Sequence, residues 1–142
     1  MRRPTTTIEA PRVRRAVWPL LRDRSSVPEA RRLVRTQLAD WGLAEHSDVA
    51  ELLASELVTN ALHHAWGKPI LTLSAQGGTL RCEVRDANPA LPHMSHTHHD
   101  DEGGRGLCLV DRLSCSWGSD RVPEGKVVWF ELSAPPKVPA HE

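Results

Sequence analysis

Apolar residues recur with a helical period in two stretches of the first half of the chain. The first stretch begins at Ser26, has Pro28 near its first turn and stops at Gly42, as helices commonly do at a glycine. The second stretch begins at Ser47 and continues to about Ala65. The pattern therefore predicts two helices, each with an apolar side that needs a partner surface.

Alternation of apolar and polar residues marks the strands. Two alternating runs joined by Gly77-Gly78 predict a hairpin, and two later runs joined through Gly125 predict another. A short alternation nearer the N-terminus is compatible with an edge strand that Pro19 ends. The predicted strands fall within 12–20, 70–75, 79–86, 115–119 and 126–132.

Between the hairpins lies a long loop followed by a third predicted helix. Residues 87–104 have no periodicity and are rich in Pro, His, Ser, Asp and Gly, and the helix is predicted to start at Leu107. Because no helix can bury its apolar side alone, the economical fold is a two-layer α/β sandwich. Its three helices would cover one face of a mixed, mostly antiparallel sheet. We expect one domain over 12–133, with tails at 1–11 and 134–142.

Charge and composition narrow the possible functions. The 142 residues include 18 basic and 18 acidic ones, so bulk electrostatics gives no support for nucleic-acid binding. No apolar run approaches the ~18 residues of a membrane span, and the basic N-terminus lacks the apolar stretch of a secretory signal. Three cysteines, Cys82, Cys108 and Cys115, suggest reduced thiols, with the first two in the core. We therefore expect a cytoplasmic protein that contacts neither membrane nor nucleic acid directly.

A polar stripe interrupts the second predicted helix. Glu56, Asn60 and His64 recur every four residues, which stacks their side chains on one face about 6 Å apart along the axis. The opposite face, which has Leu53, Leu57 and Ala61, is apolar. Such a stripe either faces water or lines a site.

Two further segments have residues suited to the same chemistry. Asp86 ends a strand and can accept a hydrogen bond, and the glycines of 103–106 can present backbone N–H groups to an anion at a helix start. An Asn60 oxygen suits Mg²⁺, and Glu56 lies one turn earlier, where a hydroxyl would lose its proton. These are the parts of a nucleotide–magnesium site, although neither a P-loop nor a Rossmann fingerprint is present.

At these segments the chain resembles the Bergerat-fold ATPases, which include gyrase and the sensor histidine kinases. Within that superfamily it is most similar to the bacterial anti-sigma-factor serine/threonine kinases. Residues 55–61 (SELVTNA) resemble the N box, 84–89 (VRDANP) the first glycine box, and 103–110 (GGRGLCLV) the second. The likeness covers roughly 27–132 and implies a Bergerat ATP-binding fold.

The resemblance implies a role for each matching residue. Glu56 would be the general base, Asn60 would coordinate the Mg²⁺ that bridges the ATP phosphates, and Asp86 would accept a hydrogen bond from the adenine amino group. Asn88, which follows Asp86 in the first glycine box, would belong to the same nucleotide site.

The second glycine box would hold the phosphates. Gly104 and Gly106 would offer backbone N–H groups, and Arg105 could grip two phosphate oxygens at once. Leu107 continues this segment into the helix, and 88–103 would form a lid over the nucleotide.

The resemblance also implies partners. The kinase-like proteins transfer a phosphoryl group from Mg-ATP to a serine or threonine of an antagonist protein, bind a sigma factor and form homodimers. An ATP-binding module that sequesters a sigma factor or other partner without transfer remains an alternative. The first glycine box here reads Asp86-Ala87-Asn88-Pro89 instead of Asp-x-Gly-x-Gly, which leaves transfer open.

A third reading rests on the histidine-rich loop. Imidazoles and carboxylates suit Zn²⁺, Ni²⁺ or Cu²⁺, but their spacing here matches no structural zinc pattern. The residues concerned are His93, His96, His98, His99, Asp100, Asp101 and Glu102. A polar lid is the favoured interpretation of this loop.

Overall fold

The structure is a computed structural model that describes residues 13–64, 67–88 and 102–133, with the side chains of 64 and 102–107 outside that description. Five strands, three α-helices and one short 3₁₀ helix follow one another in these segments. Their order along the chain is β1 (Arg14–Pro19), α1 (Ser26–Asp40), η1 (Ala44–His46), α2 (Ser47–His64), β2 (Ile70–Gln76), β3 (Thr79–Asp86), α3 (Glu102–Leu113), β4 (Ser116–Val122) and β5 (Gly125–Ser133).

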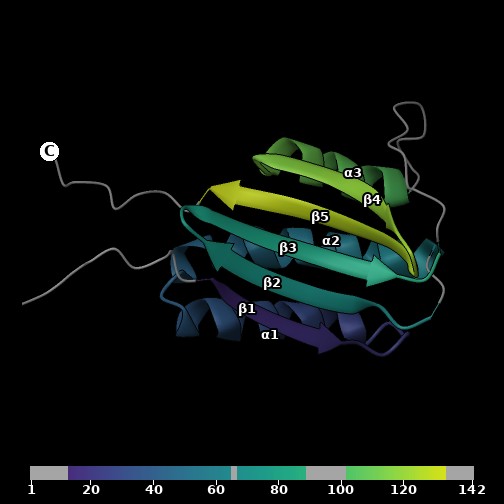
Figure 1. The fold of residues 1–142 in the computed structure, drawn as a ribbon, viewed down its shortest axis with the longest axis horizontal. Helices are drawn as coiled ribbons and strands as arrows, with labels where there is room; N and C mark the ends of the chain where they lie inside the picture. The colour runs from purple at the N-terminus through teal and green to yellow at the C-terminus, as the bar shows by residue number, and fades with distance from the viewer. Residues whose placement is uncertain (1–12, 65–66, 89–101, 134–142) are drawn as a thin grey trace, which may run out of the picture.

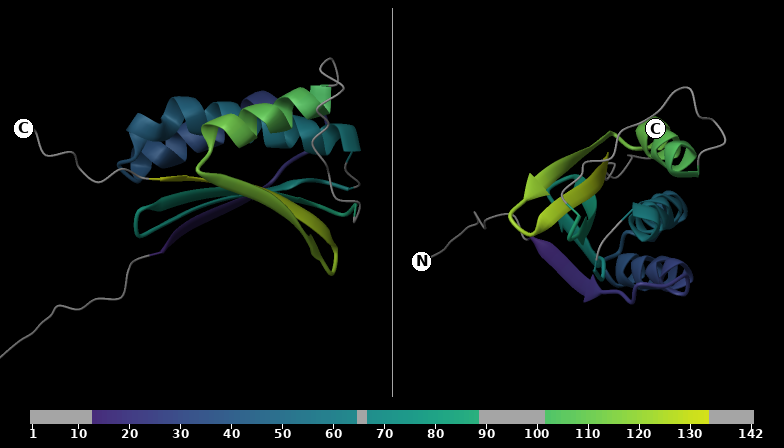
Figure 2. Two further views of the ribbon diagram at one scale, coloured as in Figure 1. Left: turned by 90° about the horizontal axis from the view of Figure 1, so that it is seen from above. Right: turned by 90° about the vertical axis from the view of Figure 1, so that its right-hand side faces the viewer.

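The five described strands form one sheet in the order β1-β2-β3-β5-β4. Every pairing in it is antiparallel, so these strands include no parallel pair of the kind that the prediction of a mixed sheet allowed. The three helices lie together on one face of the sheet (Figures 1 and 2). The predicted two-layer α/β sandwich is confirmed. The predicted tails, 1–11 and 134–142, lie outside the described residues.

The first helix begins and ends at the residues that its sequence signals indicate. It starts at Ser26, where the predicted helical stretch begins, and Ser25 is its N-cap residue. Asp23 stabilises the turn in front of it by accepting a hydrogen bond of 2.8 Å from the Ser25 N–H. Gly42 has a φ of 75°, which explains why the helix ends beside a glycine.

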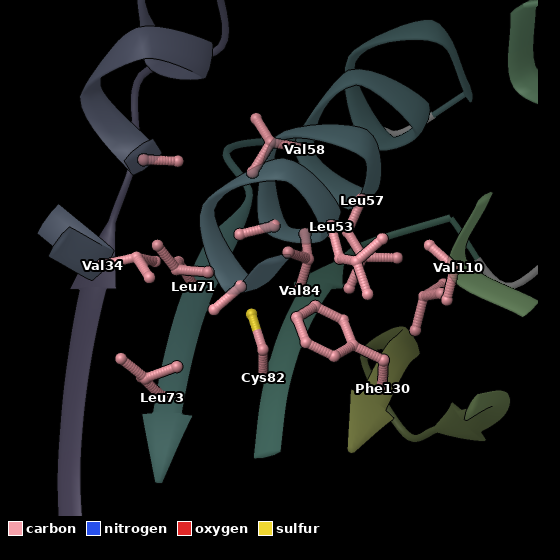
Figure 3. Close-up of a cluster of buried hydrophobic side chains, with 14 of the residues drawn as sticks. Val34, Leu53, Leu57, Val58, Leu71, Leu73, Cys82, Val84, Val110 and Phe130 are labelled. Atoms are coloured by element: carbon pink, nitrogen blue, oxygen red, sulfur yellow. The ribbon is translucent and has the colours of Figure 1, made fainter. Parts of the chain in front are cut away.

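Helix α2 is the centre of the packing. It lies between α1 and α3 and contacts β3 and β5, and its buried side meets the apolar side of the sheet (Figure 3). Leu53, Leu57 and Val58 are at most 1% exposed, and burying each such side chain contributes roughly 1.5–3 kcal/mol. Sheet residues with the same burial are Leu71, Leu73, Leu80, Cys82, Val84 and Phe130. Cys82 is therefore a core residue, as predicted.

The start of α3 differs from the prediction. The helix begins at Glu102, five residues before Leu107, so the glycine-rich segment lies inside the first turns of the helix rather than in front of it. Glycine has low helix propensity, which is why the sequence pattern placed the start later. Contact with α2 and an acidic residue at the positive end of the helix dipole favour the earlier start.

Candidate functional site

The polar stripe of α2 lies at the edge of the helix's buried side. Asn60 is only 4% exposed, while Glu56 is partly exposed. No hydrogen bond between described residues reaches the Asn60 side chain, so its amide oxygen is available to a ligand. His63, which is not part of the stripe, is exposed, and the side chain of His64 is outside the description.

Asp86 closes β3 with a buried carboxylate. Its Oδ1 accepts one hydrogen bond from the Asn88 backbone N–H at 2.8 Å and another from the Lys126 ammonium at 3.0 Å. Lys126 also donates to the Asn88 carbonyl oxygen at 3.2 Å. The side chains of Asp86 and Lys126 are each 1% exposed. The sequence analysis assigned Asp86 no partner within the chain, because Lys126 comes from a strand 40 residues away.

Gly125 lies very close to the backbone at the end of β3. It is the first residue of β5, and a Cβ atom built on it would lie 1.9 Å from the Asp86 backbone oxygen and 2.6 Å from the Ala87 Cα. Real Cβ contacts essentially never fall below 3.0 Å. The sequence predicted Gly125 only as a turn residue, whereas the structure shows that it permits β5 to approach the end of β3.

The C-terminal end of α2 lies at the same end of the sandwich as Asp86. Gly67, just past the helix, has a φ of 74°, and a Cβ atom built on it would be 3.6 Å from that of Ala87. Figures 1 and 2 show the end of α2, the end of β3 and the start of α3 at this end. The structure therefore brings together the backbone segments that carry Asn60, Asp86 and the second glycine box.

The glycines of the second glycine box differ in whether their backbone N–H has an acceptor within α3. The first four N–H groups of a helix have no acceptor within it, so the amide of Gly104, in the first turn of a helix that begins at Glu102, has no acceptor inside α3. Gly106 is the fifth residue of the helix, and its N–H faces the carbonyl of Glu102. This geometry differs from the expectation that both glycines offer amides. For Arg105 and Leu107 the structure describes only the helical backbone.

A cavity of about 670 Å³ opens on a neighbouring side of α2. Thr59 and His63 of the helix line it together with Arg22 and Arg24, which precede α1. Sequence reasoning did not find this cavity, because it forms only where the start of α1 meets the end of α2.

The described segments contain no group of three or more His, Cys, Asp or Glu residues placed to hold a metal ion. Of the histidine-rich cluster singled out in the sequence, 93–101 lie outside them, and only the backbone of Glu102 is described. No helix in the described ranges is both long and apolar enough to cross a bilayer.

Comparison with known families agrees with the fold and the converging segments. The family model of the histidine kinase-like ATPase domain matches residues 21–132, and the chain therefore belongs to this family. The match includes all three segments that resemble the Bergerat-fold ATPases, so the predicted superfamily is confirmed. No curated protein matches the chain.

The described residues fit Mg-ATP, the ligand that an ATPase domain of this family implies. Asn60 supplies an oxygen of the hard type that Mg²⁺ prefers. Asp86 supplies an acceptor for an amino group, and the first turn of α3 supplies backbone amides that have no acceptor within the helix and suit phosphate. Of the residues assigned by resemblance, Asn88 contributes its backbone N–H to the Asp86 carboxylate.

Proposed function

We propose that the chain is an anti-sigma-factor-type serine/threonine protein kinase, which transfers the γ-phosphoryl group of Mg-ATP to a hydroxyl of a partner antagonist protein. The observation that carries the proposal is the meeting of the Asn60 helix, the Asp86 strand end and the first turn of α3 at one end of the sandwich. Sigma factor as a second partner, a cytoplasmic location and a homodimer are part of the same proposal.

Each group would have a distinct role in the transfer. Asn60 would hold Mg²⁺ on the phosphates, Asp86 would accept a hydrogen bond from adenine, and the amides near Gly104 would bind phosphate oxygens. Glu56, one turn before Asn60 and partly exposed, would accept the proton of the attacking hydroxyl. Phosphoryl transfer depends mainly on positioning and charge neutralisation, so these few groups suffice.

The alternative is a module that binds ATP and sequesters a partner without transfer. It is supported by the burial of the Asp86–Lys126 pair. A base-binding site that internal contacts hold in place can bind ATP whether or not phosphoryl transfer follows. Such a module would use Asn60 and Asp86 in the same way and would not need Glu56.

Single-turnover transfer separates the two functions. The chain is mixed with γ-labelled Mg-ATP and a candidate antagonist protein that carries an acceptor serine, and label on the antagonist is followed over time. For the kinase, Glu56→Gln slows transfer by at least about 100-fold, because a general base contributes 10²–10⁴-fold. The affinity for ATP stays within about twofold of wild type.

The matched control is Glu45→Gln, since Glu45 is an exposed glutamate of η1 away from the stripe. It should transfer label at the wild-type rate. Antagonist that binds the protein but never acquires label supports the sequestering module instead. Sedimentation velocity tests the homodimer separately.

A further inference from the structure

Lys126 is a charged residue of the site to which the proposed function gives no role. In the register of the sheet it is the direct partner of Asp86 across β3 and β5. Its ammonium lies 3.0 Å from Oδ1 of Asp86 and 3.2 Å from the Asn88 carbonyl oxygen, and the residue as a whole is 1% exposed. An isolated ammonium is costly to bury, so its position requires the carboxylate beside it.

The Asp86–Lys126 pair has hydrogen-bonding capacity beyond its contacts with the described residues. A carboxylate oxygen has about two acceptor positions, and Oδ1 fills both with the Asn88 N–H and the Lys126 ammonium. Oδ2 is therefore the oxygen left to accept a further hydrogen bond. An ammonium has three hydrogens, and two of them go to Asp86 and Asn88. One acceptor and one donor thus remain side by side.

An adenine edge is complementary to that pair. Its 6-amino group is a donor and the adjacent ring nitrogen N1 is an acceptor, whereas guanine presents an acceptor at position 6 and a donor at N1. Adenine therefore forms a hydrogen bond with both the carboxylate and the ammonium. Guanine leaves these buried groups without matching partners, which costs much more binding free energy.

We propose that Lys126 is a second base-contacting residue of the nucleotide site: its ammonium donates to N1 of adenine while Oδ2 of Asp86 accepts from the 6-amino group. The proposal rests on the proposed function only in that the chain binds ATP at this site. Lys126 sets adenine specificity in two ways, by its own contact and by occupying Oδ1, so that the carboxylate has one orientation.

The test compares ATP with its 1-deaza analogue, in which a C–H replaces N1 and the amino group remains. Calorimetry with the wild-type chain and Mg²⁺ should show ATP binding at least about tenfold tighter than the analogue, as expected for a hydrogen bond to a charged group. Lys126→Met should weaken ATP binding by at least a similar factor and should weaken binding of the analogue less, because only ATP loses the N1 contact. The two nucleotides then bind this variant equally.

A control and a second measurement keep the test decisive. Arg32→Met removes an exposed cation of α1 and should retain the full preference for ATP over the analogue. If Lys126→Met does not fold, as judged by circular dichroism, the wild-type comparison still decides. Equal wild-type affinity for the two nucleotides overturns the Lys126 contact.

Two other outcomes have separate meanings. Tighter ATP binding by Lys126→Met also overturns the proposal, because the ammonium would then compete with the base for Asp86. A folded wild-type chain that binds neither nucleotide overturns the proposed function itself, a result distinct from the loss of the N1 preference alone.

Discussion

Gly125 lies against the backbone of Asp86 so closely that any side chain at position 125 would overlap it, since a Cβ atom there would be 1.9 Å from the Asp86 oxygen. Gly125 also has a φ of 154°, at the edge of the range that L side chains rarely adopt. The contact joins the first residue of β5 to the last residue of β3. The position of the candidate base-binding carboxylate thus depends on a glycine in another strand.

Gly125→Ala should destabilise the protein by about 3 kcal/mol or more, since β5 must move away from β3 to accept the methyl group. Urea denaturation of the purified variant measures this loss. Gly42→Ala is the matched control, because Gly42 also has a positive φ, of 75°, but nothing lies within 4 Å of its Cβ position. We expect the control to lose only about 1 kcal/mol. Equal losses of stability in the two variants would show that the close approach to Asp86 does not affect the free energy of unfolding.

Asp86→Asn should weaken ATP binding at least about tenfold and remove the preference for ATP over GTP, since an amide can donate as well as accept. It should also reduce the free energy of unfolding by about 3 kcal/mol, because the Lys126 ammonium remains buried without its anion. Calorimetry and urea denaturation measure the two effects. Asp40→Asn, at the exposed end of α1, should change neither. Retained selectivity in Asp86→Asn would place base recognition elsewhere.

Asn60→Ala should abolish the gain in ATP affinity that Mg²⁺ provides, because the variant has no amide oxygen to coordinate the ion. ATP binding in the presence of EDTA should match the wild type within about twofold, since the base and phosphate contacts persist. The measurement is calorimetry with and without Mg²⁺. Gln76→Ala, which removes an exposed amide at the end of β2, should keep the full magnesium effect. A full magnesium effect in Asn60→Ala would contradict the assignment of the ligand.

Glu51 makes stability depend on pH. Burial raises the pKa of its carboxyl, but hydrogen bonds from Arg35 and Ser47 and the charge of Arg35 outweigh burial and hold it below the ordinary glutamate value of 4.5. A carboxyl with a lowered folded-state pKa stabilises the fold above its unfolded-state pKa, and this contribution is lost as the pH falls through the folded-state value.

Glu51→Gln should therefore lower the free energy of unfolding at pH 7 by up to about 1 kcal/mol, a modest amount because the Arg35 side chain is 59% exposed and screened. Well below pH 4.5, where wild-type Glu51 is protonated, the difference between the two proteins should disappear. Urea denaturation at both pH values measures it. A constant difference across this range would assign the loss to packing rather than to charge.

Several elements were predictable because their signals are local. The hairpin of β2 and β3 turns at Gly77-Gly78, as predicted, and the polar stripe of α2 was visible as four-residue spacing with Asn60 at its centre. The N box and the second glycine box indicated the family before any geometry was known. Such patterns depend on residues within one or two turns of each other, which is the range over which sequence reasoning works.

The start of α3 and the surroundings of Asp86 were not predictable in this way. Low glycine propensity moved the predicted helix start to Leu107, whereas α3, which packs against α2, begins at Glu102. Nothing near Asp86 in the sequence indicates that Lys126 pairs with it, because the pairing arises from the register of β3 with β5.

The sequence by itself determined the helices, the hairpins, the layer arrangement and the residue types of a nucleotide site, since periodicity and turn chemistry act over short distances. Tertiary structure alone decided that Gly125 must be a glycine, that Lys126 neutralises Asp86, and that Asn60 lies at the same end of the sandwich as the carboxylate. The physical reason is that burial, steric overlap and charge pairing depend on distances in space, which distant strands acquire only when the sheet forms.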